Sequence, residues 1–539
     1  MTNLLPDWTQ FTLKEKIGQM IVVRASGYLF DHQIRYPIWE ASNSQLSHWL
    51  ETLNLGGVIL LGGSAAELLL RTQQLQQLSK IPLFIAADIE EGVGQRFSGA
   101  TYFPPPMALG EIAKSDLPLA VNYAYQMGKV TAQEALAMGI NWILSPIVDV
   151  NNNPDNPVIN IRSFADSPKV VSELAKAFIA GSKNYPALTT AKHFPGHGDT
   201  SSDSHLDLPI ISHDNERLES LELVPFQAAI NANVDSVMTA HLLIDAWDKE
   251  NPATLSRAIL TDKLREKLGF NGLIVTDALI MGGVAKFADA EEIAMKAVEA
   301  GADILLMPDN PEIAINSVYN AVKSGRLTVA RIDESLKRIW RAKQKIFNSQ
   351  HQNISIYQLS QKEDRETVRN ILRDSLKTSK YLPLEVTYNT GKRNLIVVDD
   401  ILNSDFLDRQ MPTVTIPNLL GYDLQLVDQN TFNNVLEDNR ETLLQIFIRG
   451  NPFRGNAGFN ETVKNSYHEL LKKSIVKGLI IYGSPYILDW FTTEISLDLP
   501  WVFSYGQMAE SQGMACQKLF NLSTAELREI SQNLGDVFI

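Results

Sequence analysis

The 539-residue sequence predicts an α/β protein in which a (β/α)₈ barrel, the TIM-barrel architecture, precedes a second, smaller C-terminal α/β domain. Short apolar runs recur between residues 20 and 307, and each is followed by helix-like sequence. Polar side chains also gather where several of these runs end. Because parallel strands need a helix to connect them, the alternation favours a parallel sheet. An open, doubly wound sheet is the alternative.

The apolar runs are short enough for strands and too short for buried helices. In chain order they are MIVVR (20–24), GVILL (57–61), PLFIAA (82–87), WILSP (142–146), LTTAK (188–192), DSVMTA (235–240), LIVT (273–276) and DILLM (303–307). Helical periodicity is clear between them in SAAELLLRTQQLQQLSK and in AEEIAMKAVEAG, which ends at a plausible C-cap, Gly301. Eight strand-and-helix units are the number that a closed barrel requires.

The composition changes after the expected barrel domain, residues 1–346. A polar linker at 347–389 contains QKEDRETVRNILRDSLKTS, in which apolar residues at helical spacing predict an amphipathic helix packed along the barrel. These residues are Val368, Ile371, Leu372 and Leu376. Residues 390–539 predict a C-terminal α/β sandwich domain, with buried strands in NLIVVDD, LLQIFIR, GLIIYG and PWVFSY. This domain has no phosphate-binding loop and no nucleophile elbow, so the sequence assigns it no function.

Charge and composition argue against several functions and partners. The chain has 48 basic and 62 acidic residues, a net charge of −14 and no basic stripe, so neither nucleic acid nor an anionic membrane is an expected partner. The N-terminus lacks the pattern of a signal peptide and no apolar run is long enough to span a membrane, which predicts a cytoplasmic protein. The single cysteine, Cys516, excludes an internal disulfide. A monomer or small homo-oligomer is expected.

The segment KHFPGHGDTSSDSHLDLP, residues 192–209, places three histidines and three aspartates among glycines and prolines. A metal site, an acid/base loop and a solvated surface loop are the competing interpretations. No metal is predicted, because barrel metallohydrolases combine ligands from several strands and Lys192 places a cation at the strand end. In the acid/base interpretation Asp203 accepts a hydrogen bond from one nitrogen of His205, and the other nitrogen faces the substrate.

Candidate functional residues follow the ends of the runs, where a barrel places its active site. They are Asp88 after the third run, Lys192 and His193 after the fifth, His241 after the sixth and Asp277 after the seventh. Asp277 has no base nearby in the sequence, as suits a carboxylate nucleophile that acts ionised. A helix N-cap is the structural alternative for Asp277 and for Asp88. Arg162 and Lys192 have a structural ion pair as their alternative, and His241 receives no role.

Four long segments resemble glycoside hydrolase family 3, in particular its β-N-acetylglucosaminidase branch. They are DIEEGVGQRF, NPVINIRSF, KHFPGHGDTSSDSHLDLP and LGFNGLIVTDALIM, within residues of about 10–345. The resemblance implies that Asp277 is the catalytic nucleophile, and that His205 is the acid/base with Asp203 as its dyad partner. It implies substrate binding by Asp88, Arg96, Arg162, Lys192 and His193. Glu91 departs from the family, since many relatives have glycine there, so the turn after the third strand is expected to differ locally.

The resemblance also implies an activity. The expected enzyme is a retaining β-N-acetylhexosaminidase that removes terminal non-reducing β-linked N-acetylglucosamine from a small carbohydrate substrate, without a cofactor. Recycling of cell-wall muropeptides is the expected setting. The alternatives are a family 3 β-glucosidase, an N-acetylglucosaminide phosphorylase, a catalytically inactive sugar-binding module and a metal-dependent hydrolase.

Overall fold

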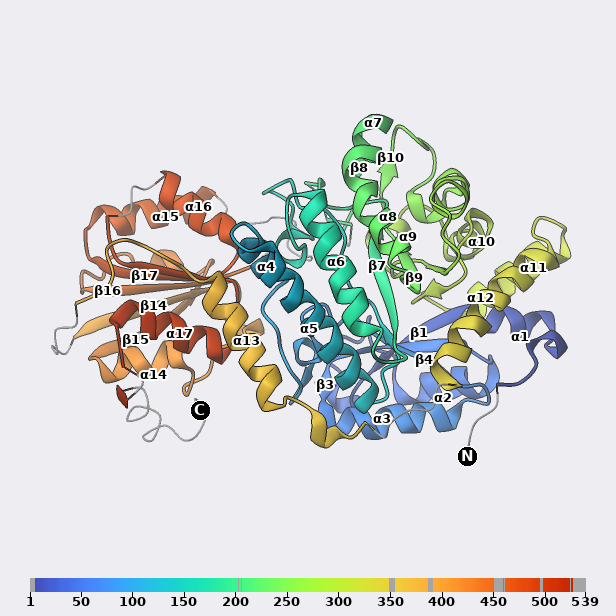
Figure 1. Cartoon of the computed structure of the whole chain (residues 1–539), viewed down its shortest axis with the longest axis horizontal. Helices are drawn as coiled ribbons and strands as arrows, with labels where there is room; N and C mark the ends of the chain where they lie inside the picture. The colour runs from blue at the N-terminus through green and yellow to red at the C-terminus, as the bar shows by residue number, and fades with distance from the viewer. Residues whose placement is uncertain are drawn as a thin grey trace. The chain divides into compact units, whose positions relative to one another are not determined.

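The chain forms two compact units, the first ending at Arg365 and the second beginning at Glu366. The computed structural model describes residues 5–201, 203–204, 206–348, 354–385, 391–449, 459, 461–494, 498–523 and 525–526. The expected acid/base, His205, lies outside the described residues. Figure 1 shows the first unit in blue to yellow and the second in orange to red, and each is described by itself here.

The first unit is the predicted barrel. Within its described residues, an eight-stranded parallel sheet carries its strands in sequence order. Each strand begins within one of the eight apolar runs, and the first and fifth strands extend two residues beyond theirs. The strands are β1 (Ile21–Ser26), β2 (Gly57–Leu61), β4 (Phe84–Ala87), β6 (Trp142–Ile143), β7 (Leu188–Phe194), β9 (Ser236–Thr239), β11 (Leu273–Val275) and β12 (Leu305–Leu306). β12 pairs with β1, and a bridge between Val275 and Ile304 joins it to β11, which brings the ends of the sheet together.

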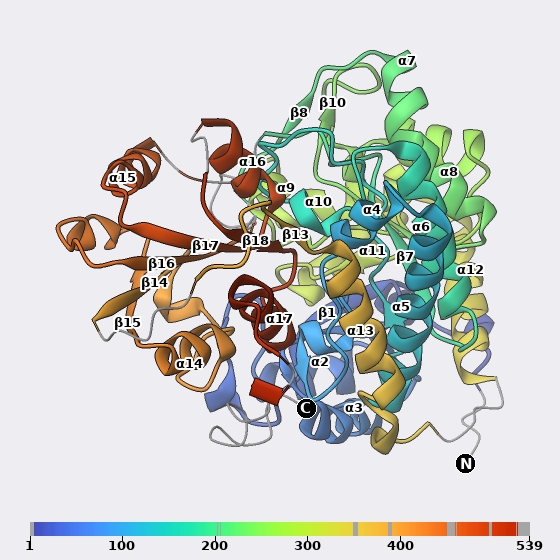
Figure 2. The same cartoon turned by 60° about the vertical axis from the view of Figure 1, so that its left-hand side comes forward.

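Helices cover the outside of this sheet, as Figure 2 shows for α5, α6 and α8. The covering segments are α2 (Asn43–Thr52), α3 (Ala65–Leu78), α4 (Met107–Ala113), α5 (Leu117–Ala137), α6 (Pro168–Ser182), α8 (Leu223–Asn231), the π-helical η7 (Ala258–Lys267), α10 (Ala290–Ala300), α11 (Pro311–Lys323) and α12 (Val329–Phe347). Side-chain N-caps start several of them, including Ser64 for α3 and Asp289 for α10, and Gly301 ends α10 with φ of 128°. No described helix combines the length and the apolar character needed to cross a lipid bilayer.

The barrel interior is packed solid beneath the strand ends. Trp142 is fully buried there, its ring centroid 5.2 Å from that of Phe84. Its indole nitrogen donates to the hydroxyls of Thr190 (2.9 Å) and Ser236 (3.0 Å), so strands β6, β7 and β9 are joined through one side chain. This packed interior therefore keeps the carboxyl ends of the strands in fixed positions.

The second unit is a three-layer α/β structure. Its six-stranded sheet has the order β13-β18-β17-β16-β14-β15 and is parallel except for β13. The elements are β13 (Lys377–Thr378), β14 (Lys392–Val398), α14 (Pro412–Leu419), β15 (Tyr422–Asp428), β16 (Thr442–Ile448), α15 (Glu461–Lys472), β17 (Val476–Gly483), α16 (Pro485–Glu494), β18 (Trp501–Ser504) and α17 (Ala509–Phe520). In Figure 1, α15 and α16 cover one face of the sheet and α14 and α17 the other.

The helix α13 (Lys362–Ser375) contains the point at which the two units divide. It lies in the polar segment for which an amphipathic helix was expected, and Val368, Ile371 and Leu372 are buried on one face. Leu376, just beyond its end, packs against the hydrophobic core of the second unit. The C-terminal half of this helix therefore belongs to the second unit, and the residue after the helix packs against that unit's core.

Candidate active site

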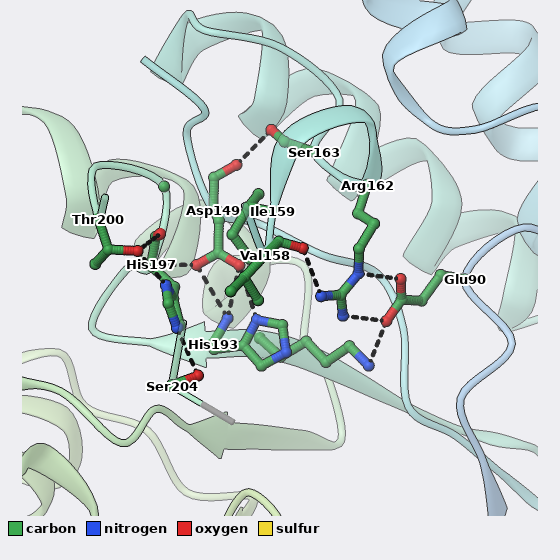
Figure 3. A network of polar contacts seen from close by, with 12 residues as sticks. Glu90, Asp149, Val158, Ile159, Arg162, Ser163, His193, His197, Thr200 and Ser204 are labelled. Atoms are coloured by element: carbon green, nitrogen blue, oxygen red, sulfur yellow. Dashed lines mark hydrogen bonds and ion pairs between the residues drawn. The ribbon is translucent and has the colours of Figure 1, made fainter. Parts of the chain in front are cut away.

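A cluster of four ionic side chains lies at the carboxyl ends of β4 and β7. The Lys192 ammonium is 2.7 Å from Oδ1 of Asp88 and 2.7 Å from Oε1 of Glu90. Arg162 forms two parallel hydrogen bonds to Glu90, each 2.8 Å long, and its Nη1 donates to the carbonyl of Val158. Figure 3 shows the Arg162 guanidinium facing the Glu90 carboxylate. Segments that are far apart in the sequence are thus joined by charge.

Burial and charge together set the ionisation of this cluster. Burial alone would raise the pKa of Glu90, but Arg162 and Lys192 hold that pKa well below its usual value. Burial would likewise lower the pKa of Lys192, and the nearby Asp88 and Glu90 raise it instead. Glu90 and Lys192 are therefore both charged at neutral pH. The Asp88 side chain is 28% exposed against 1% for Lys192, so Asp88 is the more accessible end of the cluster.

The turn after β4 is built around Gly92 rather than Glu91. Gly92 has φ of 80°, and a side chain there would come within 2.7 Å of the Thr101 carbonyl oxygen. Glu91 is fully buried and has a negative φ, so the backbone conformation at this position does not require glycine. Arg96 is exposed at the end of the turn and donates from Nε to the Asp88 carbonyl oxygen (3.2 Å). The turn thus places Arg96 beside Asp88.

Asp149, on the loop after β6, is a buried acceptor shared by two histidines. Its carboxylate accepts from Nδ1 of His193 (2.8 Å) and from the backbone N–H groups of His193 (3.1 Å) and His197 (2.8 Å). Figure 3 shows the carboxylate between the two imidazoles. Burial alone would raise the pKa of Asp149, whereas His193 and the hydrogen bonds lower it. An ionised Asp149 cannot donate, so Nδ1 of His193 carries the proton and its Nε2 is directed elsewhere.

The loops that carry these groups approach each other closely at two points. Gly198 lies against the Val150 carbonyl oxygen, which a side chain at that position would overlap at 1.8 Å. The Asn156 amide donates to the carbonyls of His197 (2.8 Å) and Gly198 (3.0 Å), while its oxygen accepts from two backbone N–H groups of its own loop. The loop after β6 is therefore fastened to the loop after β7.

Asp277 follows β11 and is partly exposed. Its Oδ1 accepts from the N–H of Ala278 (2.7 Å), and its own N–H donates weakly to Thr239 (3.4 Å). The next helix, α9 (Gly282–Ala285), has Met281 at its N-cap, so the N-cap alternative for Asp277 is wrong. A cavity of about 320 Å³ lies beside this segment, lined in part by Leu279, Ile280 and Pro308.

His241, at the end of β9, supports this turn from below. It is fully buried, with Nδ1 2.8 Å from the Thr254 hydroxyl and Nε2 3.1 Å from the carbonyl oxygen of Ala278. The Ala278 oxygen can only accept, so Nε2 of His241 donates to it. No role was expected for His241 from the sequence pattern, and in the structure it donates to the carbonyl of the residue after Asp277.

The crowded segment 192–209 separates into inner and outer side chains. His193, His197, Asp203 and Ser204 are buried, whereas Asp207 is exposed and pairs with Lys286. Asp199 forms ion pairs with His213 (2.7 Å) and Arg217 (3.1 Å) beside the loop. A uniformly solvated loop is therefore excluded for the described part of the segment. Among the described residues, no three acidic, histidine or cysteine side chains are arranged to hold a metal ion.

Three residues of the site were missed by the sequence interpretation. Glu90 and Asp149 were not singled out, and His197 was considered only as a metal ligand. Glu90 follows Asp88 at a spacing of two, which in an extended segment directs two side chains to the same side, so a signal was present. Asp149 lies six residues beyond β6, and only the loop geometry brings it to His193.

A parallel barrel with carboxylates and cations at the carboxyl ends of its strands defines an enzyme-like site of the TIM-barrel class. Residues 12–342 match the glycosyl hydrolase family 3 N-terminal domain, and residues 385–521 match the bacterial glycosyl hydrolase family 3 C-terminal domain. The chain therefore belongs to glycosyl hydrolase family 3.

Two curated relatives and one solved structure illustrate the similarity. The chain is 34% identical over 333 residues to a protein of Pseudoalteromonas piscicida named beta-hexosaminidase A, a match covering 56% of this chain and 55% of the relative. It is 34% identical over 337 residues to a beta-hexosaminidase of Nitrosomonas eutropha, covering 59% of this chain and 95% of the relative. The structure of a family 3 β-N-acetylglucosaminidase from Paenibacillus is 29% identical, with a TM-score of 0.78, over 95% of this chain and 97% of that one.

Proposed function

We propose that this chain is a retaining β-N-acetylhexosaminidase that removes terminal non-reducing β-linked N-acetylglucosamine. Family membership and the names of the relatives support the reaction class. The observation that carries the proposal is the position of Asp277: a partly exposed carboxylate at a strand end of the barrel, in a segment where Met281 takes the N-cap. A carboxylate so placed is suited to attack an anomeric carbon.

The proposed roles follow the geometry at the other strand ends. Asp277 attacks the anomeric carbon to form a glycosyl-enzyme. His205, oriented by Asp203, gives its proton to the leaving oxygen and then activates water for the second step. Charged hydrogen bonds hold a sugar hydroxyl more strongly than neutral ones do. We therefore assign binding of the terminal sugar to the cluster of Asp88, Glu90, Lys192 and Arg162.

His193 and Arg96 complete the proposed sugar-binding set. His193 has Nδ1 committed to Asp149, which leaves Nε2 to meet a sugar hydroxyl. Arg96 is exposed beside Asp88 and needs to move only its side chain to reach a ligand. We propose cell-wall muropeptides as the physiological source of the sugar, on the strength of the motif resemblance. Release of N-acetylglucosamine from a muropeptide, used as substrate in place of the aryl glycoside, tests this part of the proposal.

The deciding experiment is turnover of an aryl β-N-acetylglucosaminide, with the matching β-glucoside in parallel, by wild type and by Asp277→Asn. We expect turnover of the N-acetyl substrate and at least a 10³-fold lower kcat in the variant, because the covalent step has no nucleophile. A 5-fluoro glycosyl fluoride of N-acetylglucosamine should add one sugar mass to the peptide containing Asp277. Preference for the glucoside, or a label elsewhere, would contradict the proposal.

A matched control separates loss of the nucleophile from loss of any loop carboxylate. Asp155 is an exposed aspartate on the loop after β6, and Asp155→Asn should turn over within about twofold of wild type. Adding inorganic phosphate distinguishes the acceptor: N-acetylglucosamine as the sole product indicates a hydrolase, and its 1-phosphate indicates a phosphorylase. Loss of activity in the presence of a chelator would instead support a metal-dependent hydrolase.

A further inference from the structure

A chain of buried hydrogen bonds runs from His193 to Ser204, the residue between Asp203 and His205 in the sequence. Asp149 joins His193 to the backbone of His197, as described above. The His197 imidazole then lies between two hydroxyls, with Nδ1 2.8 Å from Oγ1 of Thr200 and Nε2 2.8 Å from Oγ of Ser204. Figure 3 shows this ring between Thr200 and Ser204. His197 is 1% exposed and Ser204 2% exposed.

The donors and acceptors around His197 specify its tautomer. Thr200 donates its hydroxyl proton to the His197 carbonyl oxygen (3.2 Å), so its oxygen accepts from Nδ1. Burial lowers the pKa of His197 to about 4, against the opposing effect of Asp149, so the ring is neutral and carries a single N–H. That proton is on Nδ1. Nε2 therefore has a lone pair, and the Ser204 hydroxyl donates to it.

Ser204 is also held from the opposite side, by the segment that follows Asp277. Its carbonyl oxygen accepts from the N–H of Gly283 (3.1 Å), at the start of α9. A side chain at Gly283 would come within 2.7 Å of that oxygen, so the two backbones are in direct contact. The residues around Ser204 form a tight turn, in which Leu206 (3.0 Å) and Asp207 (2.9 Å) both donate to the Asp203 carbonyl oxygen.

We propose that His197 is a positioning residue, whose unprotonated Nε2 accepts a hydrogen bond from the Ser204 hydroxyl. Together with the contacts of Asp149, this bond holds the segment of the proposed acid/base pair at a fixed position relative to His193, the proposed sugar-binding residue. This inference rests on the proposed function, which assigns the acid/base role to the Asp203 and His205 pair. His197 itself touches no reacting atom. It joins the loop after β7 to the loop after β6, and Ser204 joins both to the segment carrying Asp277.

The decisive variant is Ser204→Ala, assayed on two aryl β-N-acetylglucosaminides that differ in whether the leaving group must be protonated. A poor phenolate leaves only when it is protonated, whereas 2,4-dinitrophenolate leaves without a proton. The ratio kcat/KM reports the steps up to formation of the glycosyl-enzyme. We expect it to fall about 10- to 100-fold for the poor leaving group and to stay within about twofold of wild type for the dinitrophenyl substrate. Equal losses on both substrates would overturn the proposal, because general unfolding of the site slows both alike.

Matched controls test the hydrogen bond itself. Ser201→Ala removes an exposed hydroxyl from the same loop and should leave both rates unchanged. His197→Gln can place an amide oxygen near the position of Nε2 and accept from Ser204, whereas His197→Asn reaches only the position of Nδ1. The glutamine variant should therefore retain at least fivefold more activity on the poor leaving group than the asparagine variant. Equal activities of the two variants would contradict the assignment.

Hydrogen exchange gives a readout that does not depend on turnover. The amides of Leu206 and Asp207 should exchange at least tenfold faster in Ser204→Ala than in wild type or Ser201→Ala, because the turn loses its side-chain anchor. Unchanged exchange would overturn the positioning role even if the rates fell. A wild type that cleaves neither glycoside refutes the proposed function instead, and exchange then still decides whether His197 holds this turn.

Discussion

Buried ion clusters occur at both ends of the barrel, and they differ in what they leave accessible. At the amino ends of the strands, Asp303 is fully buried just before β12 and faces Arg265 (2.7 Å) and Arg338 (3.1 Å). The Ser335 hydroxyl and the Ile274 N–H also donate to its two oxygens. At the carboxyl ends, one ammonium serves two carboxylates, and Asp88 keeps 28% of its side chain exposed.

The contrast shows that a buried charge cluster does not by itself mark a functional site. Asp303 links α12 and η7 to the amino end of β12, and both its carboxylate oxygens accept from donors of the protein. The Lys192 side chain is also buried, but its partner Asp88 is partly exposed, so a ligand can reach Asp88. Position along the strands therefore predicts the role better than ionic character does. The same substitution at the two ends should have opposite effects.

The largest effect is expected from Asp303→Asn. Burial, with the neighbouring Arg338 and Arg331, already lowers the pKa of Arg265 to about 10, and removing the carboxylate leaves these guanidinium groups without their counter-charge. We expect the free energy of unfolding to fall by about 3–5 kcal/mol, with kcat/KM per folded molecule unchanged. Urea unfolding followed by tryptophan fluorescence measures the first quantity. A stable but inactive variant would place this end of the barrel in catalysis.

Asp88→Asn should show the reverse. We expect kcat/KM on the aryl N-acetylglucosaminide to fall about 10- to 100-fold, the loss of a charged hydrogen bond to a sugar hydroxyl. The urea midpoint should stay close to that of wild type, because Glu90 continues to pair with Lys192. If Asp88→Asn unfolds as readily as Asp303→Asn while turning over normally, Asp88 is a structural partner and the comparison between the two ends fails.

The smallest effect concerns Lys343, at the amino end of the barrel. Its ammonium is buried against the oxygens of Gln19 (2.7 Å) and Pro82 (2.6 Å), and burial lowers its pKa from 10.5 to about 7. Between these values the unfolded chain holds a proton that the folded chain has released, so stability rises with pH. The gain attributable to this group from pH 7 to 8 is about 1 kcal/mol.

Lys343→Met isolates this contribution. The variant loses the two hydrogen bonds at every pH, so only the change of its urea midpoint with pH is informative. We expect the free energy of unfolding calculated from that midpoint to change by about 1 kcal/mol less than in wild type from pH 7 to 8, while turnover keeps its wild-type pH profile. A parallel pH dependence of stability in the two proteins would show that Lys343 is charged in the folded state throughout this range.

Much of the fold followed from local pattern. All eight barrel strands begin in apolar runs, because strands buried on both sides are largely apolar, although β1 and β7 extend two residues beyond their runs. Four of the strands in the second unit were found in the same way. β15 was missed, because it is an edge strand whose residues, such as Leu424, are partly exposed and form no apolar run. β13 has two residues, too few for any period.

The site was predictable where function depends on the residue at a strand end, and less so where loops cross. Asp88, Lys192 and His193 could be expected together, because parallel strands end on one side of the sheet. The partnership of Asp149 with His193 and His197 could not, since it joins residues 44 and 48 positions apart through loop geometry. The bond between Ser204 and His197 depends on the tautomer of a buried ring, which no sequence pattern specifies. The roles of Asp277, Asp203 and His205 stay predictions.

The sequential order of the strands also fixes the order in which the site is made. Lys192 is synthesised 104 residues after Asp88, roughly 5–20 s later at ribosomal rates. During that interval Asp88 and Glu90 exist without Lys192, and Asp277 is synthesised only later, after the penultimate strand. A growing chain therefore contains part of the proposed sugar-binding cluster well before it contains the proposed nucleophile. On the proposed mechanism, fragments that end before β11 lack the nucleophile, and we expect them to be inactive.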